Sequence, residues 1–161
     1  MIRRPALAPL LFGFLLAGMA AAQTASFGAF RDALGTYDVF VGGRAAAVAV
    51  VIVEAIAAAG LLLSASIPRR AAQAAGLAGL CVALLWSGLA AQAFARGLEL
   101  ENCGCFGAYL AQPLRWWVLL EDGYMLVLAL LAARAAGVPL AFPAIRLRRA
   151  GAAAHRMGEA R

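Results

Sequence analysis

The residues of this chain best suited to do chemistry are two cysteines, Cys103 and Cys105, separated by a single glycine. They lie in a short polar stretch between long apolar runs. A disulfide needs Cα atoms roughly 4.4–6.8 Å apart, and a fully extended Cys-x-Cys lies near or beyond the upper limit. The chain must therefore bend at Gly104, because glycine accepts positive φ at least cost. Phe106 and Gly107 continue the turn.

A disulfide between these two cysteines would close a very small ring. A structural disulfide stabilises most when it closes a long loop of unfolded chain, and this one closes almost none. A tight ring is also easier to reduce and exchange. We therefore favour a redox-active pair; the alternatives are a local staple, two free thiols or a pair of metal ligands. Zinc usually requires four ligands, and the one histidine, His155, lies in a remote basic tail, so we set metal binding aside.

The composition indicates that a membrane protein carries this pair. The chain has 161 residues, 65% of them hydrophobic, with a mean hydropathy of +0.85, whereas soluble domains are roughly 45–50% apolar. All fourteen basic residues are arginines, and the net charge is +6. The arginines lie at the ends of apolar runs, which is typical of membrane topology, so we expect no nucleic-acid partner.

Four apolar runs predict an all-α integral membrane protein, a four-transmembrane-helix bundle. We expect the bundle within residues 1–136, with helices at about 5–22, 41–63, 71–95 and 116–136. Residues 137–161 are expected to form a basic, loosely ordered cytoplasmic tail. The first run follows two arginines and ends in small residues, so it fits either a cleaved secretory signal peptide or a retained first helix. Alanine and glycine fill every run, which favours close helix packing.

Residues 23–40 form a polar connection with one apolar stripe. Phe27, Phe30, Leu34 and Tyr37 follow the helical spacing of three and four residues. The stripe predicts a short helix, which either lies in the membrane interface or packs on the bundle.

The arginines also predict the orientation. If both termini are cytoplasmic, ten arginines lie inside and four lie outside, which is a clear positive-inside bias. The Cys-Gly-Cys loop is then on the extracytoplasmic side of the inner (plasma) membrane, where disulfides form and persist.

Two sets of residues resemble a known family. The strongest set joins Arg96-Gly97, Cys103-Gly104-Cys105-Phe106-Gly107 and Trp117-Val118-Leu119-Leu120-Glu121-Asp122. Further matches are Phe30-x-x-Ala33-Leu34-x-x-Tyr37, Glu54 and Gly60-Leu61-Leu62-Leu63. With these motifs the chain resembles, over roughly residues 10 to 135, the MauE family of methylamine-utilisation membrane proteins within the DoxX-like group. Where that family usually carries a lysine soon after its first helix, this chain has Gln23.

The resemblance implies a retained first helix, four membrane helices and a part in the maturation of periplasmic proteins. In the family that role is production of the methylamine dehydrogenase small subunit, together with a thioredoxin-like partner. The resemblance therefore implies a thiol–disulfide oxidoreductase that acts through Cys103 and Cys105. The alternative is a non-catalytic membrane assembly or anchoring subunit of a DoxX-like complex.

The four-helix outline is also similar to that of quinone-linked disulfide-forming membrane enzymes, so a membrane quinone is a candidate cofactor. Those enzymes usually carry a Cys-x-x-Cys and a second pair, whereas this chain has one pair. An internal relay between two pairs is therefore not available to it. Trp116 and Trp117 form either an aromatic belt at the membrane interface or a surface on which a quinone ring could stack.

Three other residues, Glu54, Arg96 and Arg115, are candidates for supporting roles. Glu54 is ionisable within a membrane run, and is either functional or a protonated group bonded to a neighbouring helix. Arg96 or Arg115 could stabilise a thiolate. Cys81, in the middle of the third run, has the character of a buried small hydrophobe.

A further expectation concerns charges at similar depth beneath the loop. Arg44 lies near the outer start of the second run, and Glu121 and Asp122 lie about one turn into the fourth. An unpaired charge in a membrane is costly. We therefore predict an ion pair between Arg44 and one of these acids, with the geometry that arginine and carboxylate favour.

Overall fold

The computed structural model describes residues 6–39 and 43–140. Within those ranges the chain is all-helical, with elements α1 (Leu7–Ala25), α2 (Phe27–Gly35), α3 (Gly43–Leu62), α4 (Arg69–Ala95) and α5 (Trp116–Ala135). All except α2 are long and apolar enough to cross a membrane. The prediction of an all-α protein with four transmembrane helices is therefore confirmed. The tail beyond residue 140, which we expected to be loosely ordered, lies outside the described residues.

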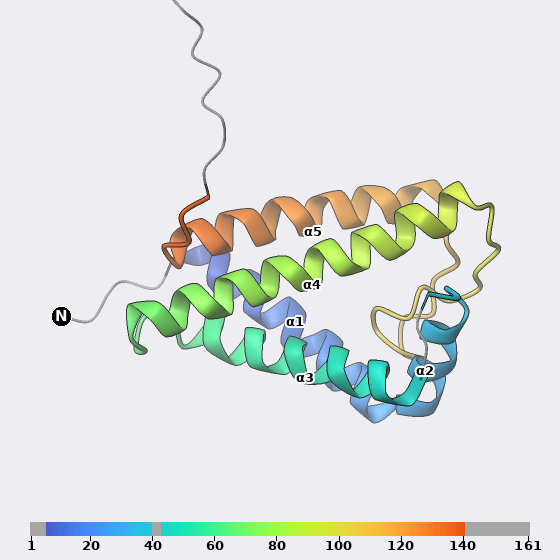
Figure 1. The fold of residues 1–161 in the computed structure, drawn as a ribbon, viewed down its shortest axis with the longest axis horizontal. Helices are drawn as coiled ribbons and strands as arrows, with labels where there is room; N and C mark the ends of the chain where they lie inside the picture. Colours follow the sequence, from blue (N-terminus) through green and yellow to red (C-terminus); the bar gives the residue numbers. More distant parts are fainter. Residues whose placement is uncertain (1–5, 40–42, 141–161) are drawn as a thin grey trace, which may run out of the picture.

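The four long helices form an antiparallel bundle (Figure 1). Helix α1 packs against α3 and α5, and α4 packs against the same two helices, so α3 and α5 lie diagonally across the bundle. The start of α1, the turn between α3 and α4 and the end of α5 gather at one end. Helix α2 and the loop between α4 and α5 cover the opposite end.

Small residues bring the helices together at several crossings. A Cβ added at Gly79 of α4 would lie 2.9 Å from the Phe12 ring of α1. One added at Gly60 of α3 would overlap the Cβ of Ala75 in α4. Side chains at these positions would force the backbones apart, as expected for membrane helices that associate through close packing.

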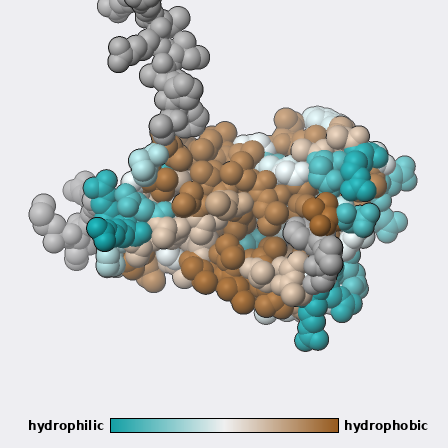
Figure 2. Space-filling view, in the orientation of Figure 1, coloured by the Kyte–Doolittle hydropathy of each residue, from teal (hydrophilic) through white to brown (hydrophobic). Residues whose placement is uncertain are grey.

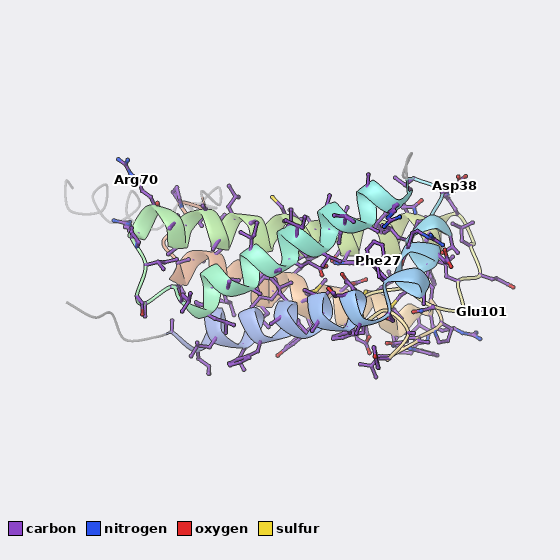
Figure 3. All side chains as sticks on the ribbon, turned by 90° about the horizontal axis from the view of Figure 1, so that it is seen from below. Phe27, Asp38, Arg70 and Glu101 are labelled. Carbon is purple, nitrogen blue, oxygen red and sulfur yellow. The ribbon has the colours of Figure 1, made fainter. Side chains whose placement is uncertain are left out.

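The outer surface is apolar along the middle of the bundle and polar at its ends. Figure 2 shows a hydrophobic band between two hydrophilic ends. In Figure 3, Arg70 lies at one end, while Asp38 and Glu101 lie at the other. Large apolar side chains on the band face outward, among them Ile56, which is 62% exposed. This distribution suits a bilayer, whose hydrocarbon core solvates apolar side chains and excludes charge.

Helix α2 packs its predicted stripe onto the bundle. Phe30, Leu34 and Tyr37 are buried, while Arg31 and Asp32 form an exposed ion pair at 2.7 Å. The helix contacts α3 and the end of α1. Of the two alternatives for this segment, the structure therefore has the helix packed on the bundle.

Candidate thiol site

The Cys-Gly-Cys motif lies in a turn that is closed by its own hydrogen bonds. Gly104 has a φ of +82° and Gly107 a φ of +57°, so the bend predicted at Gly104 is confirmed. The Asn102 Oδ1 accepts from the Gly104 N–H at 2.9 Å, and the Asn102 Nδ2 donates to the Gly107 carbonyl at 2.9 Å. The Gly107 N–H donates back to the Gly104 carbonyl at 3.0 Å. Two glycines at positive φ allow the chain to reverse within this short stretch.

The turn sits so close to the helices that its glycines have no room for side chains. A Cβ at Gly104 would lie 3.2 Å from the Cβ of Ala33 in α2. A Cβ at Gly107 would overlap the Ser26 Oγ and approach the Ala22 carbonyl to 3.1 Å. The turn is therefore seated on the ends of α1 and α2.

Polar side chains from these two helix ends hold the turn by its backbone. The Tyr37 hydroxyl donates to the Cys103 carbonyl at 2.9 Å. The Gln23 Nε2 donates to the Cys105 carbonyl at 2.9 Å, and the Ser26 Oγ accepts from the Ala108 N–H at 3.0 Å. Both cysteine carbonyls are thus fixed by side chains from elsewhere in the sequence.

Cys103 and Cys105 are both free thiols in this structure, so the disulfide between them stays a prediction. Cys103 is 5% exposed, and Cys105 is half-buried. A hydrogen-bonding interaction from the Cys105 thiol lowers the pKa of Cys103 to about 7. The same interaction, with burial, raises the pKa of Cys105 well above its usual value. One thiolate is therefore favoured, and the second thiol keeps its proton and stabilises it.

Tyr37 stays protonated beside this pair. Burial raises its pKa far above the usual value for tyrosine, and negative charge on Cys105 or Cys103 would raise it further. The Tyr37 hydroxyl consequently remains a donor to the Cys103 carbonyl when a thiolate forms.

Glu54 of α3 is fully buried in the bundle. Its Oε1 accepts from the Trp86 Nε1 of α4 at 2.6 Å, and the Gln23 amide lies within interaction range of the same carboxyl. The Glu54 Oε2 and the Gln23 Oε1 are buried without a hydrogen-bond donor among the described residues. The contact with Trp86 agrees with the interpretation of Glu54 as a group bonded to a neighbouring helix.

Asp122 is a second buried carboxyl group near the thiols. It is 7% exposed, and its Oδ2 has no hydrogen-bond partner within residues 6–39 and 43–140. A negative charge on Asp122 would raise the pKa of both cysteines, behind the larger contribution of the interaction between the two thiols. Two buried carboxyl groups from different helices, Glu54 of α3 and Asp122 of α5, are therefore near enough to the thiol pair to influence the pKa of Cys105.

The ion pair predicted between Arg44 and an acid of α5 is wrong. Among the described residues the ion pairs are Arg31–Asp32 and Arg96–Asp38. Arg44 is exposed at the start of α3, and Glu121 accepts from the Gln112 Nε2 at 3.1 Å. The physical reason is that α3 and α5 are diagonal in the bundle, so side chains at similar depth on them face different neighbours.

Arg96 has a different role from the one we expected. Its guanidinium donates from Nη1 to the Tyr37 carbonyl and the Gln92 Oε1, both at 3.1 Å, and lies 3.8 Å from Asp38. Neither Arg96 nor Arg115 is among the groups that shift the pKa of either thiol. Arg96 therefore fixes the end of α2. The Cys105 thiol, not an arginine, stabilises the Cys103 thiolate.

Beside the thiols is a cavity of about 440 Å³ between α1, the loop and α5. It is lined by Leu15, Met19, Cys103, Cys105, Phe106, Leu110, Gln112, Val118, Leu120, Glu121, Asp122, Tyr124 and Met125. The Phe106 ring also reaches α1, since a Cβ added at Gly18 would lie 3.9 Å from it. Sequence reasoning missed this cavity, and it missed Trp86 as a partner of Glu54. It also missed Gln23 as a donor to the Cys105 carbonyl. The available signal was a polar glutamine at the end of an apolar run.

The remaining candidates lie away from the cavity. Cys81 is exposed on the outer face of α4 and not buried as expected. Trp116 and Trp117 pack edge to face with ring centroids 5.9 Å apart. Both are exposed at the start of α5, and neither lines the cavity beside the thiols. Their place in an aromatic belt stays a prediction.

The fold and the site define a class: a multi-pass membrane protein of four apolar helices with a dithiol in a fixed turn at one end of the bundle. A family model described as "Methylamine utilisation protein MauE" matches residues 4–135. The chain belongs to the MauE family, and it is a membrane protein of the methylamine-utilisation type. No curated protein and no solved structure matches it significantly.

Proposed function

We propose that this protein is a membrane thiol–disulfide oxidoreductase that exchanges disulfides with a thioredoxin-like partner through Cys103 and Cys105. The observation that carries the proposal is the thiol pair itself, held in one turn with the pKa of Cys103 lowered to about 7. A pair with one stabilised thiolate is suited to exchange, because a thiol of lower pKa leaves a disulfide faster. The exchange would serve maturation of a periplasmic protein, such as the methylamine dehydrogenase small subunit served by the family.

The lower pKa of Cys103 suggests the order of the steps, because the thiol of lower pKa is the better leaving group. A thiolate of the reduced partner therefore attacks the Cys105 sulfur of the Cys103–Cys105 disulfide. Cys103 leaves as the thiolate, and Cys105 is held in a mixed disulfide. The second partner thiol then attacks the partner sulfur of that bond and releases Cys105. The partner ends as a disulfide, and Cys103 and Cys105 end as thiols carrying its two protons.

The proposal places the turn outside the cytoplasm and both termini inside. It is supported by the positive-inside bias and by the end-to-end arrangement of the bundle, since Arg69 and Arg70 begin α4 at the end opposite the turn. A reporter that is active only outside the cytoplasm, fused at the C-terminus, should give no signal. A signal there would contradict this orientation.

The exchange is tested with purified protein in detergent and reduced bacterial thioredoxin as the probe. Oxidised protein should convert thioredoxin to its disulfide, as measured by alkylation and gel shift. Cys103→Ser cannot form the disulfide, so it should leave thioredoxin reduced. Cys81→Ser, which changes the thiol on the outer face of α4, is the matched control and should exchange normally. Full function of the Cys103→Ser and Cys105→Ser variants in cells would instead favour the alternative, a non-catalytic assembly or anchoring subunit.

A further inference from the structure

The cavity beside the thiols has the size and lining of a small-molecule site. Its volume of about 440 Å³ lies within the roughly 300–1,000 Å³ typical of ligand pockets. Leu15 and Met19 of α1 face Val118 and Met125 of α5 across it. Both cysteines line it, so a molecule bound there would lie against the sulfur atoms.

One buried carboxyl group marks the polar part of this cavity. Asp122 lines the cavity. Its exposure is 7%, so it is 93% buried. Its Oδ2 has no hydrogen-bond partner among the described residues. Buried polar atoms are normally satisfied. A ligand with an oxygen acceptor would complete this site when the carboxyl group carries a proton, because the hydroxyl of a carboxylic acid donates.

The cavity opens where the protein surface is apolar. Leu110, Leu120 and Tyr124 are lining residues that are 60%, 64% and 66% exposed. The last two belong to the membrane-spanning helix α5. A ligand that reaches the thiols by this route must be soluble in the bilayer.

We propose that this cavity binds the ring of a membrane-soluble quinone, which oxidises Cys103 and Cys105 to their disulfide. The inference rests on the proposed function, because it supplies the oxidant that regenerates the disulfide. A quinone is apolar, carries carbonyl oxygens that accept from Asp122, and accepts two electrons. These properties correspond to the lining, the unpartnered carboxyl group and the dithiol.

The reaction balances within the site. The Cys103 thiolate and the Cys105 thiol lose two electrons in total as the S–S bond forms, and the quinone gains them. One quinone oxygen takes a proton from Asp122, and the second takes the proton of Cys105. Asp122 is then reprotonated by the proton that Cys103 released on forming its thiolate. Two thiols and one quinone give one disulfide and one quinol.

The test uses the full-length protein in detergent, reduced beforehand, with decylubiquinone as the probe. Quinol formation is followed by absorbance and disulfide formation by alkylation. The wild-type protein should form about one quinol per dithiol. The double variant Cys103→Ser/Cys105→Ser should bind the quinone, as measured by quenching of tryptophan fluorescence, and form no quinol. Asp122→Asn keeps a donor, so it should bind with similar affinity and react more slowly, by about a hundredfold.

Two variants that fill different hollows of the protein give a matched comparison of quinone binding. Leu15→Trp places bulk against the thiols and should weaken decylubiquinone binding at least about tenfold. Ala59→Trp fills the groove between α1 and α3, which contains no thiol, and should leave binding unchanged. Far-ultraviolet circular dichroism and thermal unfolding in detergent check that both variants are folded.

The outcomes separate this inference from the proposed function. Thioredoxin exchange without quinone binding or quinol formation overturns the inference and leaves the proposed function intact. Quinol formation without thioredoxin exchange supports quinone binding and contradicts the proposed exchange with a thioredoxin-like partner. If Leu15→Trp and Ala59→Trp weaken binding equally, or if decane displaces the quinone with equal affinity, the cavity accepts an acyl chain and the inference is overturned.

Discussion

The Trp86 Nε1 lies 2.6 Å from the Glu54 Oε1, and this contact joins α4 to α3 inside the bundle. Both side chains are almost completely buried. The Trp86 ring also packs against Phe30 of α2, with centroids 6.3 Å apart, and it lies 3.9 Å from where a Cβ at Gly104 would be. The carboxyl group is therefore one contact away from the turn that carries the thiols.

The first prediction concerns this acceptor. Glu54→Leu leaves the buried Trp86 N–H without a partner and should lower the free energy of unfolding by about 1–3 kcal/mol. Glu54→Gln keeps an oxygen acceptor at the same place and should cost clearly less. Thermal unfolding in detergent measures both. Equal losses for the two variants would mean that the hydrogen bond contributes little.

The second prediction concerns the pH dependence of Cys103. Because its pKa is lowered to about 7, the reactive thiolate should be half-formed near neutral pH, whereas an ordinary cysteine reaches that point near about 8.5. Alkylation rates against pH, measured in a Cys81→Ala background, give the midpoint. Cys105→Ser keeps a donor and should hold the midpoint low; Cys105→Ala removes the donor and should raise it. The same midpoint in both variants would contradict this origin of the shift.

The third prediction concerns Gly107. Alanine at this position meets a positive φ, which costs roughly 1–2 kcal/mol, and it also overlaps Ser26. Gly107→Ala should therefore displace the turn and reduce thioredoxin exchange. Gly97→Ala is the matched control, because Gly97 also has a positive φ but no atom within 4 Å of an added Cβ. If Gly97→Ala reduces thioredoxin exchange as much as Gly107→Ala, the overlap with Ser26 is not the cause of the loss.

The fourth prediction concerns Tyr37. Tyr37→Phe removes the donor to the buried Cys103 carbonyl and should cost about 1–3 kcal/mol of stability. The loosened turn should also let an alkylating reagent reach Cys103 faster. Tyr109→Phe alters an exposed tyrosine and should change neither quantity. Unchanged alkylation in Tyr37→Phe would show that the other contacts suffice to hold the turn.

The fifth prediction follows from the diagonal placement of α3 and α5. Arg44→Ala should change stability by less than about 0.5 kcal/mol, because exposed side chains without specific contacts contribute little. In a double-mutant cycle with Asp122→Ala the losses should add. A coupling energy well above the measurement error would restore the ion pair that the structure excludes.

The sequence predicted the features that depend on local composition and spacing. Apolar runs of membrane length correctly predicted α1, α3, α4 and α5, because each run must satisfy its backbone within one helix. The stripe from Phe27 to Tyr37 predicted α2, and the glycine between the cysteines predicted the bend.

Neighbour relations across the bundle were not accessible in the same way. The position of Arg44 along its helix gave its depth in the bundle but not its direction, so the expected partner was wrong. Cys81 was expected inside, yet it faces outward, because an all-apolar membrane helix does not reveal which side is buried. Gln23, Tyr37 and Trp86 meet the turn only because of the packing order of the helices.

The hydrogen bond between Gln23 and Cys105 spans 82 residues of sequence, and this separation sets the order of assembly during synthesis. When α1 and α2 have left the ribosome, the turn that they support has not yet been made. The thiols emerge only after α3 and α4, and the cavity is incomplete until α5 joins α1. A nascent chain should therefore acquire protection of Cys103 from alkylation in its last stage of insertion, and chains truncated before α5 should remain fully reactive.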